Sequence, residues 1–179
     1  AVSAGQAMIS TGESHTCALK ISGRPFCWGL NQYGQIGDGT QEYRQQVPSR
    51  VRGRGMVRLT RPSQSVGLAL SSITAGWDHS CGLARTGEAY CWGSNRETQL
   101  GDGKLDTLSS TTRDSTSYQR EPTRVTGALA FESISAGRYH TCALTAAGEA
   151  YCWGSNAHGQ VGDGAFIEEH REWYEYPDN

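Results

Sequence analysis

The chain has 179 residues, enough for one domain with a sizeable core, and a net charge of −2. It contains no run of eighteen apolar residues, which excludes a membrane-spanning helix, and its charge argues against bulk electrostatic binding of nucleic acid. The 23 glycines, set among many short alternating runs, indicate an all-β fold. We therefore expect a single all-β unit over residues 1–179, with neither membrane insertion nor a nucleic-acid partner.

A stretch of about thirty residues occurs three times, as Ile9–Gly39, Ile73–Gly103 and Ile134–Gly164. The copies begin 64 and 61 residues apart. A near-constant period indicates a repeat architecture, in which one supersecondary unit is copied and stacked. We expect three units, over residues 9–72, 73–133 and 134–179.

Each copy predicts a β-hairpin. In the third copy, strands at His140–Leu144 and Ala150–Trp153 flank Ala146-Ala147-Gly148, which suits a three-residue loop with glycine in the left-handed conformation. This loop places two cysteines directly opposite each other, where Cα atoms lie about 4.5–5.5 Å apart, within reach of a disulfide. The same register in all copies predicts three disulfides: Cys17–Cys27, Cys81–Cys91 and Cys142–Cys152.

The alternative for the cysteines is a metal site. His15, His79 and His140 each stand two residues before a cysteine, so a His–Cys–Cys zinc site in every repeat is conceivable. Zinc sites normally need CxxC spacing or a spatial Cys/His cluster, whereas six cysteines in matched pairs favour disulfides and an oxidising compartment. We therefore expect no metal and no cofactor, and interpret the histidines as hydrogen-bonded residues at strand ends.

The linkers between the copies share a P-x-R-V-x-G core, at Pro48–Gly53 and Pro122–Gly127. Proline is tolerated at sheet edges, so this core predicts a further edge strand in each unit. Charge is segregated nearby: Tyr43–Trp77 carries six arginines and no acid, and Ala165–Asn179 carries five acids. These segments are either solvated loops or complementary ends that meet each other or a partner.

Most repeated residues are best interpreted as structural. The tryptophans should pack between units, and the aspartates between two glycines should accept turn N–H groups. More informative are two positions that change within the fixed G-x-x-H motif, because a structural role would tend to keep one residue there. Tryptophan, arginine and tyrosine, which are enriched in binding hot spots, occur among them. The candidate binding residues are Glu13, Ser14, Trp77, Asp78, Arg138 and Tyr139.

These motifs resemble the regulator-of-chromosome-condensation repeat: I-x-A-G-x-x-H-x-x-A-L, a glycine turn, then W-G-x-N-x-x-G-Q-L-G-D-G and P-x-x-V. The resemblance implies a β-propeller with one four-stranded blade per repeat, and the paired cysteines resemble secreted or cell-surface members. Glu97-Thr98 stands where the other copies have Tyr33-Gly34 and His158-Gly159, so we expect the turn of the second copy to differ. Three blades cannot close a ring of four to eight. We therefore expect a partial propeller or half of a multi-chain ring or array, whose open edges allow self-association.

These features favour an extracellular, non-enzymatic module that binds a protein or glycan through loops on one propeller face. One alternative is a structural subunit of an extracellular assembly, and another is an inhibitor of a secreted enzyme. Guanine-nucleotide exchange, the activity of the founding member, is opposed by the disulfides and the lack of a basic surface. No catalytic constellation stands out in the sequence.

Overall fold

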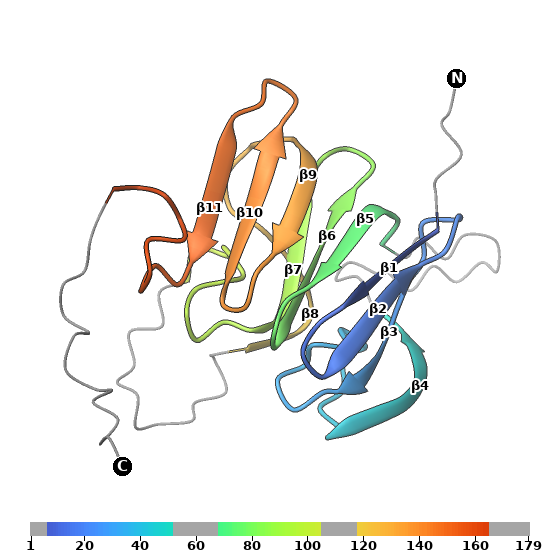
Figure 1. Ribbon diagram of the computed structural model, residues 1–179. Helices are drawn as coiled ribbons and strands as arrows, with labels where there is room; N and C mark the ends of the chain where they lie inside the picture. The colour runs from blue at the N-terminus through green and yellow to red at the C-terminus, as the bar shows by residue number, and fades with distance from the viewer. Residues whose placement is uncertain (1–6, 52–67, 105–117, 165–179) are drawn as a thin grey trace, which may run out of the picture.

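The computed structural model describes residues 7–51, 68–104 and 118–164, which form three antiparallel sheets arranged side by side (Figure 1). These residues contain strands and turns, and no helix among them could cross a membrane. The strands of the first sheet are β1 (Met8–Thr11), β2 (His15–Leu19), β3 (Pro25–Leu30) and β4 (Arg44–Arg50). Those of the second are β5 (Leu70–Ala75), β6 (His79–Ala84), β7 (Ala89–Ser94) and β8 (Tyr118–Arg124). The third sheet contains β9 (Phe131–Ala136), β10 (His140–Thr145) and β11 (Ala150–Gly154).

Each sheet is a blade whose strands follow one another in chain order. The first strand of blade 2, β5, contacts the first strands of both its neighbours, β1 and β9. This arrangement is the partial β-propeller that the repeats predicted. We number the blades 1 to 3 in chain order. The division into units at residues 72 and 133 stays a prediction.

The hairpins have the predicted register. Cys142 pairs with Cys152 across β10 and β11, Ala143 with Tyr151, and Gly148 in the loop has a positive φ of 81°. All six cysteines form the three expected disulfides, each within its own hairpin and with Cα atoms 4.1 Å apart. The zinc alternative is therefore wrong for these cysteines.

The predicted edge strand exists in blades 1 and 2, but it begins earlier than expected. β4 and β8 end before the valine of the P-x-R-V-x-G core. Val51 and Val125 follow the strands and are buried, and their N–H groups donate to the carbonyls of Pro25 and Ala89. The P-x-R part of the core therefore forms the end of the strand, and the valine that follows closes the blade against its own hairpin. The inserts at Arg54–Val66 and Lys104–Arg120 lie wholly or largely outside the described residues, as does the acidic tail.

The turn after the W-G pair is held by side chains in the same way in all three blades. In blade 2, the Asn95 side-chain oxygen accepts the N–H of Leu100 at 3.0 Å, and the Gln99 side-chain oxygen accepts the N–H of Glu97 at 2.8 Å. Asn31 and Asn156, with Gln35 and Gln160, make the equivalent bonds. The turn therefore fixes where the backbone carbonyl of the glutamine points.

The expectation that this turn differs in blade 2 is wrong. Thr98 takes the place of Gly34 and Gly159, yet it adopts the same left-handed conformation, with φ of 58° against 77° and 73°. Its N–H donates to the carbonyl of Asn95 at 3.0 Å, as the glycines do to their own asparagines. A β-branched residue is disfavoured at positive φ, so the surrounding hydrogen bonds impose the turn on an unfavourable residue.

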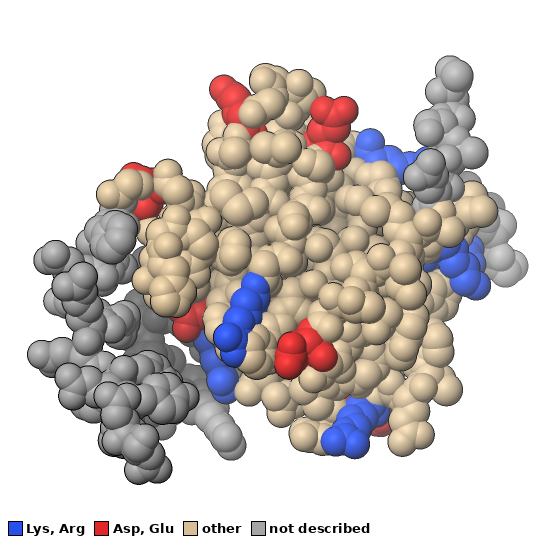
Figure 2. Space-filling view, in the orientation of Figure 1, with Lys and Arg blue, Asp and Glu red and all other residues tan. Residues whose placement is uncertain are grey.

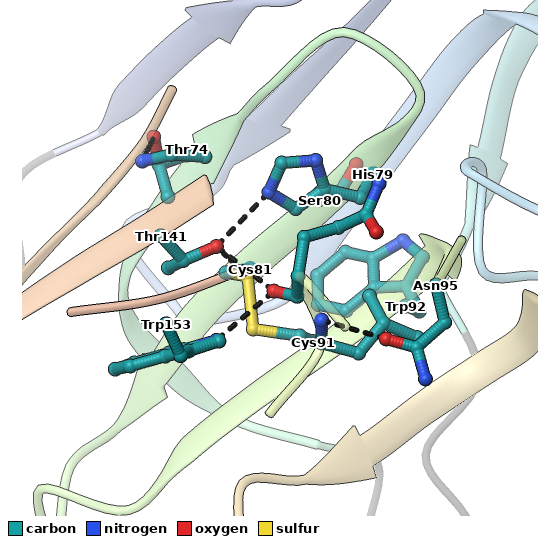
Figure 3. The surroundings of a disulfide bond; sticks show 12 residues. Thr74, His79, Ser80, Cys81, Cys91, Trp92, Asn95, Thr141 and Trp153 are labelled. Carbon is teal, nitrogen blue, oxygen red and sulfur yellow. Dashed lines mark hydrogen bonds between the residues drawn. A yellow bond between two sulfur atoms is a disulfide. The ribbon is translucent and has the colours of Figure 1, made fainter. Parts of the chain in front are cut away.

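Neighbouring blades meet through a joint with a repeated set of hydrogen bonds. Between blades 2 and 3, the Gln99 carbonyl accepts both the Thr141 hydroxyl, at 3.0 Å, and the Trp153 indole N–H, at 2.9 Å. The ring Nε2 of His79 lies 3.0 Å from the same hydroxyl (Figure 3). Because the hydroxyl has one proton and donates it to the carbonyl, Nε2 must be the donor to the hydroxyl.

The joint between blades 1 and 2 repeats this arrangement atom for atom. The Gln35 carbonyl accepts the Ser80 hydroxyl and the Trp92 indole N–H, both at 3.0 Å, and His15 Nε2 lies 2.8 Å from Ser80 Oγ. The joints are also apolar: Ile36, Val51, Leu70 and Trp92 pack together at the first, and Leu83, Leu100, Val125 and Phe131 at the second. The prediction that tryptophans pack between blades is thus confirmed for Trp92 and Trp153.

Candidate functional site

The variable G-x-x-H turns join the first and second strands of each blade. Their backbone is fixed by a repeated hydrogen bond. The carbonyl of the second variable residue accepts the N–H of the residue that stands two positions after the tryptophan of the same blade. The acceptor carbonyls are those of Ser14, Asp78 and Tyr139, at 2.8–2.9 Å. The three turns therefore have the same backbone anchor and differ in the side chains that they present.

The three turns converge on one hollow of about 460 Å³. The first variable residue of each turn lines it, namely Glu13, Trp77 and Arg138. The other lining residues are small, and they precede the variable positions: Thr11, Gly12, Ala75, Gly76, Ala136 and Gly137. The fold thus brings an acid, an indole and a guanidinium from three blades around one small-residue surface.

Arg138, Trp77 and Tyr139 form a single cluster across the joint between blades 2 and 3. The guanidinium carbon of Arg138 lies 3.2 Å from the centroid of the Trp77 ring and 5.1 Å from that of Tyr139. The two aromatic rings are stacked, with centroids 5.4 Å apart and planes 14° from parallel. Arg138 remains exposed, and the rings are half-buried. Such cation–π contacts preorganise a charged and aromatic surface before a partner arrives.

Asp78 lies beside this cluster but points to a different set of neighbours. Its Oδ1 accepts a hydrogen bond from Gln35 Nε2 of blade 1 at 3.4 Å. Partial burial raises the pKa of Asp78, and the charge of Glu13 adds to this, while Arg96 acts in the opposite direction. Arg96 in turn lies 4.7 Å from the centroid of the Tyr33 ring. Arg96 and Tyr33 thus form a second charged and aromatic pair, on the side of Asp78.

The six candidate residues therefore separate into two groups. Glu13, Trp77 and Arg138 share the hollow, and Tyr139 joins them through stacking. Ser14 is exposed and Asp78 half-buried, and neither lines the hollow. Sequence reasoning missed the small residues that form the rest of the hollow, although the glycine before each variable pair was a signal for close backbone approach.

The chemistry that these residues offer is recognition by charge and aromatic surface. The histidines next to the site are engaged in the joints: burial lowers the pKa of His15 to about 4 and that of His79 to about 3. Within the described ranges, no group of three potential metal ligands occurs. Figure 2 shows acidic and basic side chains interspersed over the described part of one face, rather than gathered by sign.

Comparison with known proteins places this fold and these motifs in a family. The family models for the regulator of chromosome condensation (RCC1) repeat match residues 9–35, 70–99 and 131–160, and also residues 86–144. The chain belongs to the RCC1 repeat family.

Several relatives share the repeats. The chain is 32% identical to the ultraviolet-B receptor UVR8 of Arabidopsis thaliana over 171 residues, covering 90% of this chain and 32% of that protein. It is 34% identical to the probable E3 ubiquitin-protein ligase HERC6 of Homo sapiens over 157 residues, covering 86% of this chain and 13% of that protein. The chain thus spans about a third or less of the length of these relatives.

The fold likewise resembles solved propellers. A crystal structure of Kap60 bound to yeast RCC1 (Prp20) matches with a TM-score of 0.69 at 30% identity, covering 89% of this chain and 34% of that one. The structure of Prp20p from Saccharomyces cerevisiae, described with its binding properties to Gsp1p and histones, matches with the same TM-score and identity, covering 35% of that chain. Prp20 is thus described as a protein that binds Kap60, Gsp1p and histones.

Proposed function

We propose that this chain is a non-enzymatic, extracellular binding module that recognises a protein through the hollow lined by Glu13, Trp77 and Arg138. The observation that carries the proposal is the convergence of three variable residues on one hollow, while the repeated residues around them serve the fold. Structural positions would tend to keep one residue in every blade, whereas these carry an acid, an indole and a guanidinium.

The residues favour a protein over a glycan. Arg138 and Glu13 are exposed and of opposite charge, so a ligand with paired charges, such as a peptide segment, finds a partner for each. The half-buried Trp77 ring supplies apolar contact area between them. That Prp20, which shares the fold, binds Kap60, Gsp1p and histones supports this choice.

The disulfides support the extracellular part of the proposal. Three disulfides close the hairpins of the three blades, and such bonds persist in oxidising compartments. Trapping thiols with an alkylating reagent in freshly opened source cells tests this directly. We expect all six cysteines to be protected; alkylation of the six cysteines in protein recovered from the cells would contradict an extracellular location.

The binding test uses a random peptide display library selected on the immobilised chain, with a glycan array in parallel. Selected ligands are then titrated against Trp77→Ala, Arg138→Ala and a control, Ile21→Ala, whose exposed side chain lies in the β2–β3 loop. We expect the first two variants to weaken binding by about 1–3 kcal/mol each and the control to leave it unchanged. If the selected ligands bind all variants equally, the binding site does not include the hollow. If glycans bind strongly and the same two variants lose that binding, the partner is a glycan rather than a protein.

A further inference from the structure

The turn between β3 and β4 of blade 1, residues 32–41, carries variable residues of its own. The segment that follows each W-G pair leaves two positions open, which are Gln32-Tyr33 in blade 1, Arg96-Glu97 in blade 2 and Ala157-His158 in blade 3. As in the G-x-x-H turns, the hydrogen bonds that hold the backbone repeat while these side chains change. Blade 2 packs directly against the turn of blade 1, which therefore lies at an internal joint of the chain.

An arginine of blade 2 covers the tyrosine of this turn. The guanidinium carbon of Arg96 lies 4.7 Å from the centroid of the Tyr33 ring. Arg96 is exposed and Tyr33 is half-buried. One joint further along, Arg138 of blade 3 covers Trp77 of blade 2 in the same way. A guanidinium over the face of a ring keeps its N–H groups free for a ligand, so Arg96 is held in place without losing its donors.

A second arginine of blade 2 is fixed at the same turn by close backbone packing. The N–H of Gly39 donates to the carbonyl of Arg120 at 3.1 Å. Gly34 permits this approach, because a Cβ atom there would lie 2.7 Å from the Arg120 Cα. The side chain of Arg120 is nevertheless exposed. Strand β8 therefore holds Arg120 beside the turn and leaves its guanidinium at the surface.

Hydrogen bonds run from Arg120 around the turn to the residue before Tyr33. Nη2 of Arg120 donates to the hydroxyl of Tyr118 at 3.1 Å, and that hydroxyl donates to the side-chain oxygen of Gln41 at 3.0 Å. Gln41 in turn donates through Nε2 to the carbonyl of Gln32 at 3.1 Å. One segment of blade 1 thus positions both arginines of blade 2. We call Tyr33, Arg96, Tyr118 and Arg120 the arginine–tyrosine patch.

The charges of the patch favour a ligand with separated carboxylates. Within the described ranges, neither Arg96 nor Arg120 forms a salt bridge, and a guanidinium binds a carboxylate in bidentate geometry. The surroundings also contain acids, because Asp78 interacts electrostatically with Arg96 and Glu97 is exposed next to it. These acids repel a densely charged polyanion such as a sulfated glycan. Two spaced acidic side chains of a peptide can instead reach one guanidinium each.

We propose that the arginine–tyrosine patch is a second binding site, which takes an acidic peptide segment of a partner protein and pairs one carboxylate with Arg96 and another with Arg120. The ring of Tyr33 and the hydroxyl of Tyr118 hold the two guanidinium groups before the ligand arrives, which reduces the entropic cost of binding. The proposal is independent of the binding function at the hollow, because the patch shares no residue with the lining of the hollow.

The test uses two displayed peptide libraries in which two fixed positions are separated by a varied number of random residues. Both fixed positions are glutamate in one library and glutamine in the other. Each library is selected on the immobilised full chain as wild type, Arg96→Gln, Arg120→Gln and Arg138→Gln. Arg24→Gln is the matched control, since Arg24 is an equally charged and exposed residue in the β2–β3 loop. Circular dichroism confirms that each variant is folded.

We expect the wild type to enrich the glutamate library over the glutamine library by about tenfold, as two exposed charge pairs allow. Arg96→Gln and Arg120→Gln should each lower this preference by about threefold, because each removes one pair, and Arg24→Gln should leave it unchanged. A wild type without a preference for glutamate, or a preference that either patch variant leaves unchanged, would overturn the proposal. A preference lost only in Arg138→Gln would also overturn it and would assign the recognition of acids to the hollow.

Discussion

The joints between blades and the variable turns lie only a few residues apart in each repeat, yet they behave in opposite ways. The two joints use the same four groups: a histidine ring, a hydroxyl, a glutamine carbonyl and an indole N–H. In the turns, the backbone bond repeats but the side chains are Glu13, Trp77 and Arg138.

This difference separates two demands on one motif. A joint removes polar groups from water, so each donor needs a matched acceptor and a single change leaves a buried group unpaired. The turn side chains line an open hollow and are exposed or half-buried, so the fold sets few limits on their identity. Repetition therefore marks what holds the blades together, and variation marks where a partner can be recognised.

The largest expected loss of stability comes from removing the tryptophan side chain from a joint. Trp92 is fully buried between blades 1 and 2, so Trp92→Ala should destabilise the chain by about 3–5 kcal/mol in urea unfolding. The matched control is Trp28→Ala, the equivalent residue on the open face of blade 1, which should cost about 1 kcal/mol. Equal losses for both variants would show that the joints are not what stabilises the blades.

A smaller effect comes from acidification of the joints. His15 and His79 donate through Nε2. The Nδ1 of His79 has no partner, so protonation would bury an unpaired N–H there. At His15 the backbone of Trp77 favours the protonated form, but the cost of burial outweighs it. Burial lowers the pKa of His15 from its ordinary value of 6.5 to about 4 and that of His79 to about 3. Below pH 6.5 the unfolded chain takes up protons that the folded chain does not, so stability is fully present above pH 6.5 and falls as the pH falls.

We expect a loss of about 2–3 kcal/mol between pH 6 and pH 5 from these two histidines together. Urea unfolding at a series of pH values measures it. In His79→Gln, whose amide can still donate to Thr141, the pH dependence in this range should fall by about half. A variant with the full pH dependence would show that His79 does not contribute.

A still smaller change in stability is expected from replacing the threonine that adopts a left-handed conformation in the turn of blade 2. Thr98 holds a left-handed conformation that glycine adopts without strain. Thr98→Gly should therefore stabilise the chain by about 0.5–1 kcal/mol, since relief of strain outweighs the greater freedom of the unfolded chain. Thr86→Gly, in an exposed hairpin loop, is the control and should destabilise slightly. A loss of stability on Thr98→Gly would mean that the threonine side chain contributes contacts of its own.

The Thr98 turn also shows where sequence reasoning reached its limit. The hairpins, their register and the disulfides could be predicted, because loop length and alternation fix which residues oppose one another. The turn in blade 2 was mispredicted because local propensity was weighed without the bonds to Asn95 and Gln99 that override it. The outer strands were placed too late for a similar reason: Val51 and Val125 look like strand residues but close the core.

The candidate site was predictable as a set of positions, though not as a shape. Variation within a fixed motif identified Glu13, Trp77 and Arg138. That they share one hollow, and that Asp78 bonds instead to Gln35, depends on how blades pack, which local sequence does not encode. The hydrogen bonds of the joints could not be predicted from the sequence either, because their partners lie more than forty residues apart along the chain.

The most direct test of the central claim is the unfolding free energy of a chain with all three hollow residues removed, E13A/W77A/R138A. If the turns serve recognition and the joints serve the fold, this triple variant should unfold within about 1 kcal/mol of the wild type, since exposed cation–π contacts contribute little. A loss as large as that of Trp92→Ala, about 3–5 kcal/mol, would show that the variable residues hold the blades together and would contradict the separation of roles.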